Sequence, residues 1–148
     1  MRAVVTRVSG ARVIADGVPA GQIGRGFLVL LGVGKEDRPS DARKLAKKIC
    51  GLRVFEDGAG KMNVSLAEAG GELLVVSNFT LYASCARGRR PDFFPAAAAP
   101  VALELYELFL DSCRDEGFDP QTGVFGAEMA VESVNDGPVT LIIDSAEL

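Results

Sequence analysis

The chain has 148 residues, of which 48% are hydrophobic and 24% charged, and its formal net charge is −4. This composition is typical of a soluble globular protein, and the length suits one domain with a single core. The negative charge excludes a generally basic nucleic-acid-binding protein, so any nucleic-acid partner must meet a local patch. Charges near the N-terminus interrupt any signal-peptide core, and no apolar run approaches the roughly 20 residues of a membrane span. We therefore expect a cytoplasmic protein that does not bind membranes.

The sequence contains no histidine and three cysteines, Cys50, Cys85 and Cys113. The missing histidine excludes Ser-His-Asp and Cys-His catalysis and histidine-ligated metals. The cysteine spacings match no zinc pattern, and Cys50 and Cys113 fall in helix-like segments where a thiol usually acts as a small buried apolar group. We expect no metal and no cofactor, so any chemistry must use backbone dipoles, hydroxyls, carboxylates, Lys, Arg or groups of the substrate.

Alternating and apolar runs in the first third of the chain predict strands. Residues 2–8 and 11–15 alternate, and Asp16-Gly17 predicts a hairpin turn into residues 18–20. The continuous apolar run 27–33 predicts a buried strand.

Arg7 is a charged residue near the end of the first predicted strand. It is either a solvated strand charge or a buried anchor for a backbone carbonyl.

Two segments carry clusters of basic residues. A helix is predicted from Pro39 to about Cys50, and its outer face holds Lys44, Lys47 and Lys48. The loop 85–91 holds three arginines. Each cluster is either an ordinary solvated surface or a patch that meets a phosphate backbone.

The rest of the chain completes an alternation of strands and helices. Short strands are predicted at residues 52–55 and 62–64, and a buried strand at 72–76. A long helix, stopped by Gly117, has a buried stripe of Ala102, Leu105, Tyr106, Phe109 and Cys113.

Residues 128–134 and 139–143 predict the last two strands, so strands precede, separate and follow the two predicted helices. This order predicts one compact α+β domain over residues 1–148 with a largely antiparallel or mixed sheet.

One stretch that could carry chemistry is Ser77-Asn78-Phe79-Thr80-Leu81, which follows a buried strand with no turn residue between. The backbone N–H groups of Phe79 and Thr80 can hold a carbonyl oxygen as it becomes an oxyanion. Thr80 could be a nucleophile, but the chain has no histidine to activate it. An ordinary strand edge is the alternative interpretation.

The other stretch is Asn135-Asp136-Gly137-Pro138-Val139-Thr140, between the last two predicted strands. Glycine is the least restricted residue before proline, because it has no Cβ to clash with the proline ring, and an X-Pro bond can be cis. A hairpin turn is the ordinary interpretation.

Together these two stretches resemble the paired signature motifs of the D-aminoacyl-tRNA deacylase family, also called D-tyrosyl-tRNA deacylases. The resemblance extends over nearly the whole chain and includes residues 7–8, 30–33, 60–63, 87–93 and 122–129. The family usually has Gln after the serine of the first motif, where this chain has Asn78. Because Asn is one methylene shorter, any contact of that side chain is in question, whereas the amides of Phe79 and Thr80 are not.

The resemblance implies an enzyme that cleaves the ester between a D-amino acid and the terminal adenosine of tRNA, and that also removes glycine from mischarged tRNA. It implies a homodimer with active sites at the interface, in which a cis Gly137-Pro138 peptide reaches into the partner's pocket and excludes L-side chains. It also implies catalysis assisted by the RNA 2′-hydroxyl, with the protein positioning the ester. A non-catalytic RNA-binding or structural dimer on the same fold remains the alternative.

The resemblance also implies roles for individual residues. The catalytic segment is formed by Ser77, Asn78, Phe79 and Thr80. Arg7 matches a family arginine that braces the Gly-Pro segment, whereas Phe125 and Met129 match residues close to the pocket and the adenosine.

Overall fold

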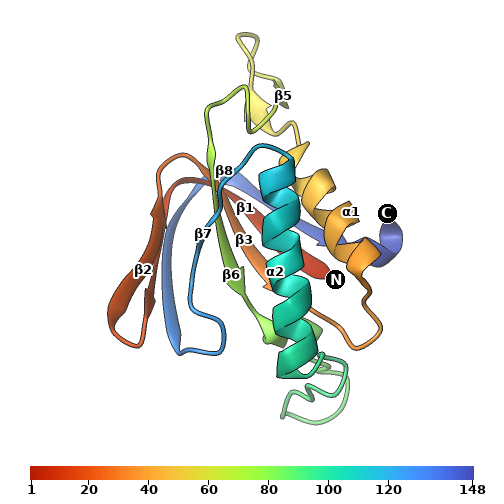
Figure 1. Ribbon diagram of the computed structural model, residues 1–148. Helices are drawn as coiled ribbons and strands as arrows, with labels where there is room; N and C mark the ends of the chain where they lie inside the picture. The colour runs from red at the N-terminus through yellow and green to blue at the C-terminus, as the bar shows by residue number, and fades with distance from the viewer.

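Two helices lie on one face of a six-stranded mixed sheet, as the computed structural model of residues 1–148 shows (Figure 1). The strands are β1 (Arg2–Ala15), β2 (Val18–Ile23), β3 (Gly26–Gly32), β6 (Glu72–Ser77), β7 (Gln121–Thr122) and β8 (Met129–Asp144). The helices are α1 (Pro39–Cys50) and α2 (Ala99–Asp115), and a separate hairpin pairs β4 (Phe55–Glu56) with β5 (Met62–Val64). Two 3-10 turns, η1 (Phe79–Tyr82) and η2 (Ser145–Glu147), complete the chain. No helix is both long and apolar enough to cross a membrane.

Strand β1 is the centre of the sheet. It pairs antiparallel with β8 along its whole length, while its other edge pairs with β3 in the first half and with β2 in the second. The pairs β3–β6 and β6–β7 are parallel. Parallel neighbours need crossover connections of one handedness, which α1 and α2 supply, so both helices lie on the same face. The predicted α+β class and mixed sheet are confirmed.

The predicted division of the last segment into two strands joined by a hairpin turn is wrong. Thr140 pairs with Thr6 and Asn135 with Val8, so β8 is one strand and the residues between form a bulge opposite Arg7. Both halves of β8 pair with the same neighbour, so the turn-type residues displace the strand without reversing it. In the same way β1 runs unbroken through residues 9–10, where the sequence suggested a gap.

Two smaller differences concern short strands. The strand predicted at 52–55 is displaced to Phe55–Glu56, and β7, only two residues long, was not predicted. Pairs this short leave no periodic pattern, because alternation needs about four residues to be visible.

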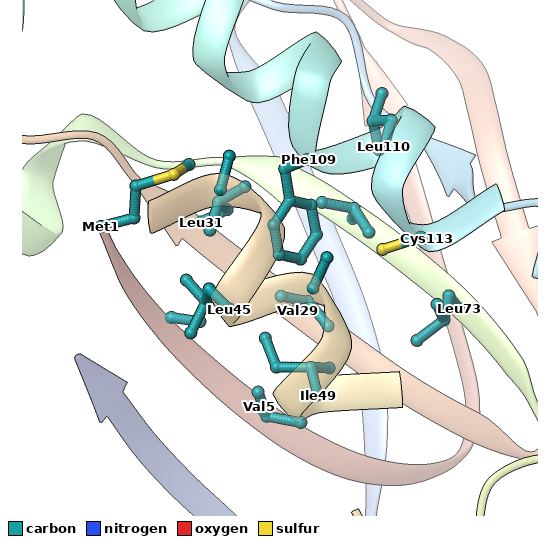
Figure 2. Packing of buried hydrophobic residues seen from close by; sticks show 14 of the residues in the cluster. Met1, Val5, Val29, Leu31, Leu45, Ile49, Leu73, Phe109, Leu110 and Cys113 are labelled. Carbon is teal, nitrogen blue, oxygen red and sulfur yellow. The ribbon is translucent and has the colours of Figure 1, made fainter. Parts of the chain in front are cut away.

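The main core lies between the sheet and the two helices (Figure 2). Alternate residues of β1 and β3, such as Val5 and Val29, face Leu45 and Ile49 of α1 and Phe109 of α2. Every member of the stripe predicted for the second helix is buried, as are Cys50 and Cys113. The contact with Cys50, together with burial, raises the pKa of the Cys113 thiol, so both cysteines pack as apolar groups.

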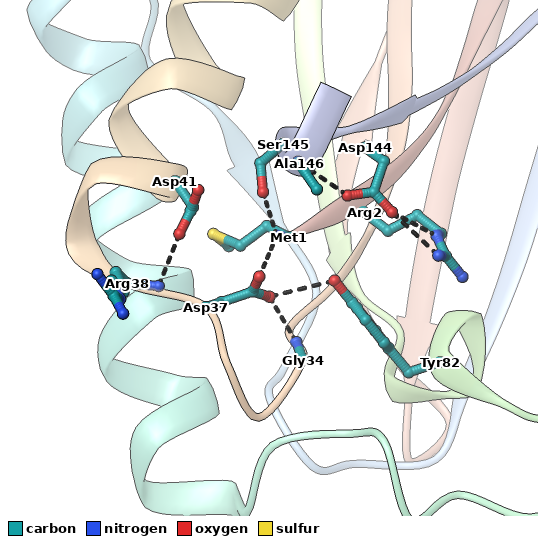
Figure 3. A network of polar contacts seen from close by, with 10 residues as sticks. All are labelled: Met1, Arg2, Gly34, Asp37, Arg38, Asp41, Tyr82, Asp144, Ser145 and Ala146. Carbon is teal, nitrogen blue, oxygen red and sulfur yellow. Dashed lines mark hydrogen bonds and ion pairs between the residues drawn. The ribbon is translucent and has the colours of Figure 1, made fainter. Parts of the chain in front are cut away.

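A polar network fastens the start of β1 to the loops around it (Figure 3). The buried ammonium group of Met1 pairs with Asp37 and donates to Ser145 Oγ. The other oxygen of Asp37 accepts from the Gly34 amide at 2.6 Å and from the Tyr82 hydroxyl at 3.2 Å. Arg2 donates to the Leu81 carbonyl oxygen at 3.0 Å. The turn η1 is thereby held at two points, by the first residue of β1 and by the loop that follows β3.

Candidate active-site pocket

An apolar pocket of about 370 Å³ opens where the parallel strands β3 and β6 end. Ligands of sheets with parallel strands commonly bind at the carboxyl ends of those strands. The lining is made by Leu31, Val33, Ser77, Asn78, Phe79, Ala97, Ala99, Ala102, Tyr106, Phe125, Gly126, Ala127 and Met129. The predicted site residues Ser77, Asn78, Phe79, Phe125 and Met129 therefore share one cavity.

The turn η1 presents two unpaired backbone donors beside this pocket. The Asn78 amide donates to the Leu31 carbonyl oxygen at 2.8 Å, which ends the β3–β6 ladder. The first bond of the turn runs from the Leu81 amide to the Asn78 carbonyl oxygen at 3.4 Å, and no side chain caps it. The N–H groups of Phe79 and Thr80 precede that bond and have no partner within the turn. Two adjacent N–H groups of this kind can stabilise an oxyanion.

The Thr80 hydroxyl is used within the turn. Its Oγ1 donates to Oδ1 of the Asn78 side chain, and Thr80 does not line the pocket. An amide oxygen cannot act as a base toward a hydroxyl near neutral pH, so this contact does not activate Thr80 as a nucleophile. The shorter Asn78 side chain is thus occupied by a local hydrogen bond.

The only titratable side chain in the pocket lining is that of Tyr106. Its hydroxyl donates to the Val75 carbonyl oxygen at 2.9 Å, and burial raises its pKa to about 12. A general base needs a pKa near the working pH, and no group in the pocket meets this condition. Nowhere in the protein do three or more His, Cys, Asp or Glu side chains gather as metal ligands would. The pocket therefore offers shape and hydrogen-bond donors.

We expect the tyrosines to make stability fall at high pH. An unfolded tyrosine ionises near pH 10, whereas folded Tyr106 ionises at about 12. Between these values the unfolded state has released its proton and the folded state has not, so the free energy of unfolding falls as the pH rises. Urea unfolding from pH 9 to 12 should show a shallower fall for Tyr106→Phe than for the wild type.

The direct check is the ultraviolet absorbance of tyrosinate, because the chain has two tyrosines and no tryptophan. Burial also raises the pKa of Tyr82, with Asp37 and Asp144 adding to the effect. A folded protein whose tyrosines ionise at the same pH as in urea would contradict the burial of Tyr106 and the partial burial of Tyr82.

Arg7 is a buried anchor, and the solvated alternative is wrong. Its side chain is 5% exposed. Nε donates to the Asp136 carbonyl oxygen at 2.9 Å and Nη1 to the Val54 carbonyl oxygen at 2.5 Å, while the Asp136 carboxylate lies 3.4 Å away. Arg7 thus holds the bulge that contains Gly137 and Pro138. The Gly137–Pro138 peptide is cis, Gly137 has φ +136°, and both residues are exposed.

The bulge lies away from the pocket of the same chain. Arg7, opposite the bulge, pairs with Phe27 at the start of β3, whereas the pocket begins at Leu31. This separation along the strand is roughly 13 Å. Gly137 and Pro138 do not line the pocket. The pocket and the turn η1 therefore lie together in one chain, whereas Gly137 and Pro138, the predicted filter against L-side chains, lie away from them.

Several pocket residues were not singled out as site residues by sequence reasoning. Tyr106 and Ala102 were predicted as core on the stripe of α2, and they also form the pocket wall. Ala97 and Ala99 belong to an alanine run, whose small side chains leave room for the cavity. The sequence feature that could have indicated Ala97 and Ala99 as pocket residues is the run of alanines directly before the helix.

The chain is similar to known proteins over nearly its whole length. A family model described as D-Tyr-tRNA(Tyr) deacylase matches residues 4–144. The chain is 51% identical over 148 residues to the D-aminoacyl-tRNA deacylase of Thermosipho africanus (strain TCF52B), covering 100% of this chain and 99% of the relative. It is 55% identical over 147 residues to that of Thermus aquaticus, covering 99% and 97%.

Two solved structures are similar over 97% of this chain and 98% of their own. The c-Myc DNA Unwinding Element Binding Protein superposes with a TM-score of 0.90 at 40% identity. A probable eukaryotic D-amino acid tRNA deacylase superposes with a TM-score of 0.83 at 17% identity, which shows the shared fold alone.

The fold and the pocket define a class of small α+β domains. In this class, paired parallel strands end at an apolar cavity, and a 3-10 turn beside the cavity presents two free backbone N–H groups; we call it the donor turn. Within that class, the chain belongs to the D-Tyr-tRNA(Tyr) deacylase family.

Proposed function

We propose that the protein is a D-aminoacyl-tRNA deacylase, a cytoplasmic hydrolase that cleaves the ester joining a D-amino acid to the terminal adenosine of tRNA. Membership of the family, with relatives of that name at about half identity over the full length, supports this function. The observation that carries it is the pair of free N–H groups at Phe79 and Thr80 beside a pocket without an acid or base near neutral pH.

The reaction then depends on positioning. The ester carbonyl oxygen accepts from the Phe79 and Thr80 amides, which stabilise the negative charge that develops when water attacks the carbon. The neighbouring 2′-hydroxyl of the terminal ribose assists that attack in place of a protein base. The acyl–oxygen bond breaks, and the D-amino acid and the tRNA leave. The protein accelerates the reaction because it holds the ester and the hydroxyl close together in a reactive geometry.

Selection against L-residues is assigned to Gly137 and Pro138 of a partner subunit. The exposure of the bulge and its anchoring by Arg7 support this assignment. A backbone wall in the pocket collides with the side chain of one enantiomer only. Glycine has no side chain, so glycyl-tRNA is also a substrate.

A homodimer would bring the bulge to the partner's pocket. The sheet face away from the helices carries exposed apolar residues, among them Val131 at 37% and Ile142 at 74% exposure. A second hollow, which shares Ser77, Asn78 and Met129 with the pocket, extends across this face. Exposed apolar surface joined to a pocket is typical of a subunit interface.

Sedimentation at micromolar concentration should therefore give about twice the chain mass of 15.6 kDa. Activity per chain should fall on dilution into the range where the dimer dissociates, because each complete site needs both subunits. A monomer with full activity would rule out the shared site.

The function is tested by incubating the purified protein with D-Tyr-tRNA and measuring released D-tyrosine, with L-Tyr-tRNA as the control. Multiple turnovers on the D-substrate and none on the L-substrate are expected. The 40% identity to a protein named for binding a DNA element supports a second candidate, a non-catalytic nucleic-acid-binding dimer. That candidate would be favoured if no D-residue and no glycine were released.

A further inference from the structure

An exposed aromatic side chain, Phe94, lies in the segment that leads into the wall of the pocket. The segment 93–97 runs beside residues 33–35, with the Lys35 amide donating to the Pro95 carbonyl oxygen at 3.1 Å and the Ala97 amide to that of Val33 at 2.9 Å. Val33 and Ala97 both line the pocket, so this segment is part of its wall. Phe94, three residues before Ala97 in this segment, is 73% exposed.

The neighbouring Phe93 has a different environment. Its ring packs edge-on against Phe79 with the centroids 5.1 Å apart. Phe93 therefore supports the donor turn, whereas Phe94 makes no aromatic contact and packs in neither core cluster. The exposure of Phe94 has no explanation in the folding of this chain.

One positive charge lies against Phe94, and three more lie in the loop before it, although the chain is acidic. The Lys35 ammonium lies 3.3 Å from the centroid of the Phe94 ring, so it covers one face of the ring. Ser84 and Asp92 exchange backbone hydrogen bonds at 2.7 and 2.9 Å, which closes a loop directly before Phe93. That loop contains the exposed Arg87, Arg89 and Arg90.

We propose that Phe94 and Lys35 form a stacking platform for the nucleotide that precedes the terminal adenosine of the tRNA, with the loop arginines contacting backbone phosphates. The inference rests on the proposed function, since it assumes that the pocket takes the terminal aminoacyl-adenosine. Exposed aromatic rings set among cationic side chains are the usual means of binding single-stranded nucleic acid, because every base has a π-face.

Stacking can be observed without catalysis. The chain contains no tryptophan, so Phe94→Trp introduces a single tryptophan at the platform, whose fluorescence can be excited apart from that of the two tyrosines. The RNA trinucleotide CCA should quench this fluorescence, and adenosine alone should not. The matched control is Met62→Trp, which is also exposed and lies on the β4–β5 hairpin at the opposite end of the molecule (Figure 1). The trinucleotide should leave the control unquenched.

Kinetics then separate the platform from the pocket. Phe94→Ala should raise KM for D-Tyr-tRNA about tenfold with little change in kcat. The same variant should hydrolyse D-tyrosyl-adenosine, which lacks the preceding nucleotide, as the wild type does. Phe94→Trp should restore the wild-type KM, whereas Phe94→Leu, which keeps apolar area without a π-face, should not.

Three results would overturn the platform. They are equal quenching by adenosine and the trinucleotide, an unchanged KM for tRNA in Phe94→Ala, and dissociation of the Phe94→Ala dimer, which would make Phe94 a subunit contact. Failure of the proposed function is a separate outcome, because the wild type would then release D-tyrosine from neither substrate, while quenching of Phe94→Trp by the trinucleotide would still show the platform.

Discussion

Gly137→Ala is expected to lower kcat/KM for D-Tyr-tRNA by about a hundredfold or more while the protein remains folded. A Cβ at this position would lie 2.8 Å from both Cγ2 and the backbone nitrogen of Val139, and 3.1 Å from Nη2 of Arg7. In addition, the φ of +136° is rarely adopted by a residue with a side chain. The backbone of the bulge must therefore move, and a shift of about 1 Å in a positioning group is enough for a loss of this size.

The matched control is Gly117→Ala, at the end of α2. Gly117 also has a positive φ, +92°, but a Cβ there would meet no atom within 4 Å. Both variants carry a similar backbone cost of about 1–3 kcal/mol. Thermal unfolding should therefore show a loss of stability for both variants, larger for Gly137→Ala because its Cβ also meets Val139, whereas activity should fall only for Gly137→Ala. Equal activity of the two variants would mean that the bulge does not contribute to the site.

The parts of the site that could be predicted from the sequence are those set by neighbouring residues. The stripe of α2 follows from helical spacing, and the donor turn at Phe79 and Thr80 follows from polar residues placed directly after a buried strand. The bulge could not be predicted, because the same turn-type residues serve a hairpin or an irregular strand. Only the pairing of both halves of β8 with β1 distinguishes the two, and that pairing joins residues far apart in the chain.

The burial of Arg7 has the same origin. Its partners, the carbonyl oxygens of Asp136 and Val54, lie 129 and 47 residues away in sequence. A charged residue in a strand gives no local sign of such partners, so both interpretations were open until the fold was known. The dual position of Tyr106, in the core and in the pocket wall, likewise depends on where α2 begins relative to the ends of β3 and β6.

The second large effect concerns the substrate. D-Tyr-tRNA that ends in 2′-deoxyadenosine and is charged on the 3′ oxygen should be hydrolysed about a hundredfold or more slowly, the size of effect expected when an acid–base group is lost. Tyr106, with a pKa of about 12, is the only titratable side chain lining the pocket, so the protein has no group there to replace the missing hydroxyl. Single-turnover rates with saturating enzyme measure the chemical step directly.

Thr80→Ala is the matching change in the protein, and it should retain activity within about tenfold of the wild type. The substitution removes a hydroxyl that donates to the Asn78 side chain but keeps the Thr80 N–H, which is the group assigned to the oxyanion. If Thr80 were instead the nucleophile, the variant would be inactive, and the 2′-deoxy substrate would react at nearly the normal rate. If a folded Thr80→Ala dimer bound tRNA but released no D-tyrosine, the result would show that Thr80, and not the RNA hydroxyl, is the catalytic group.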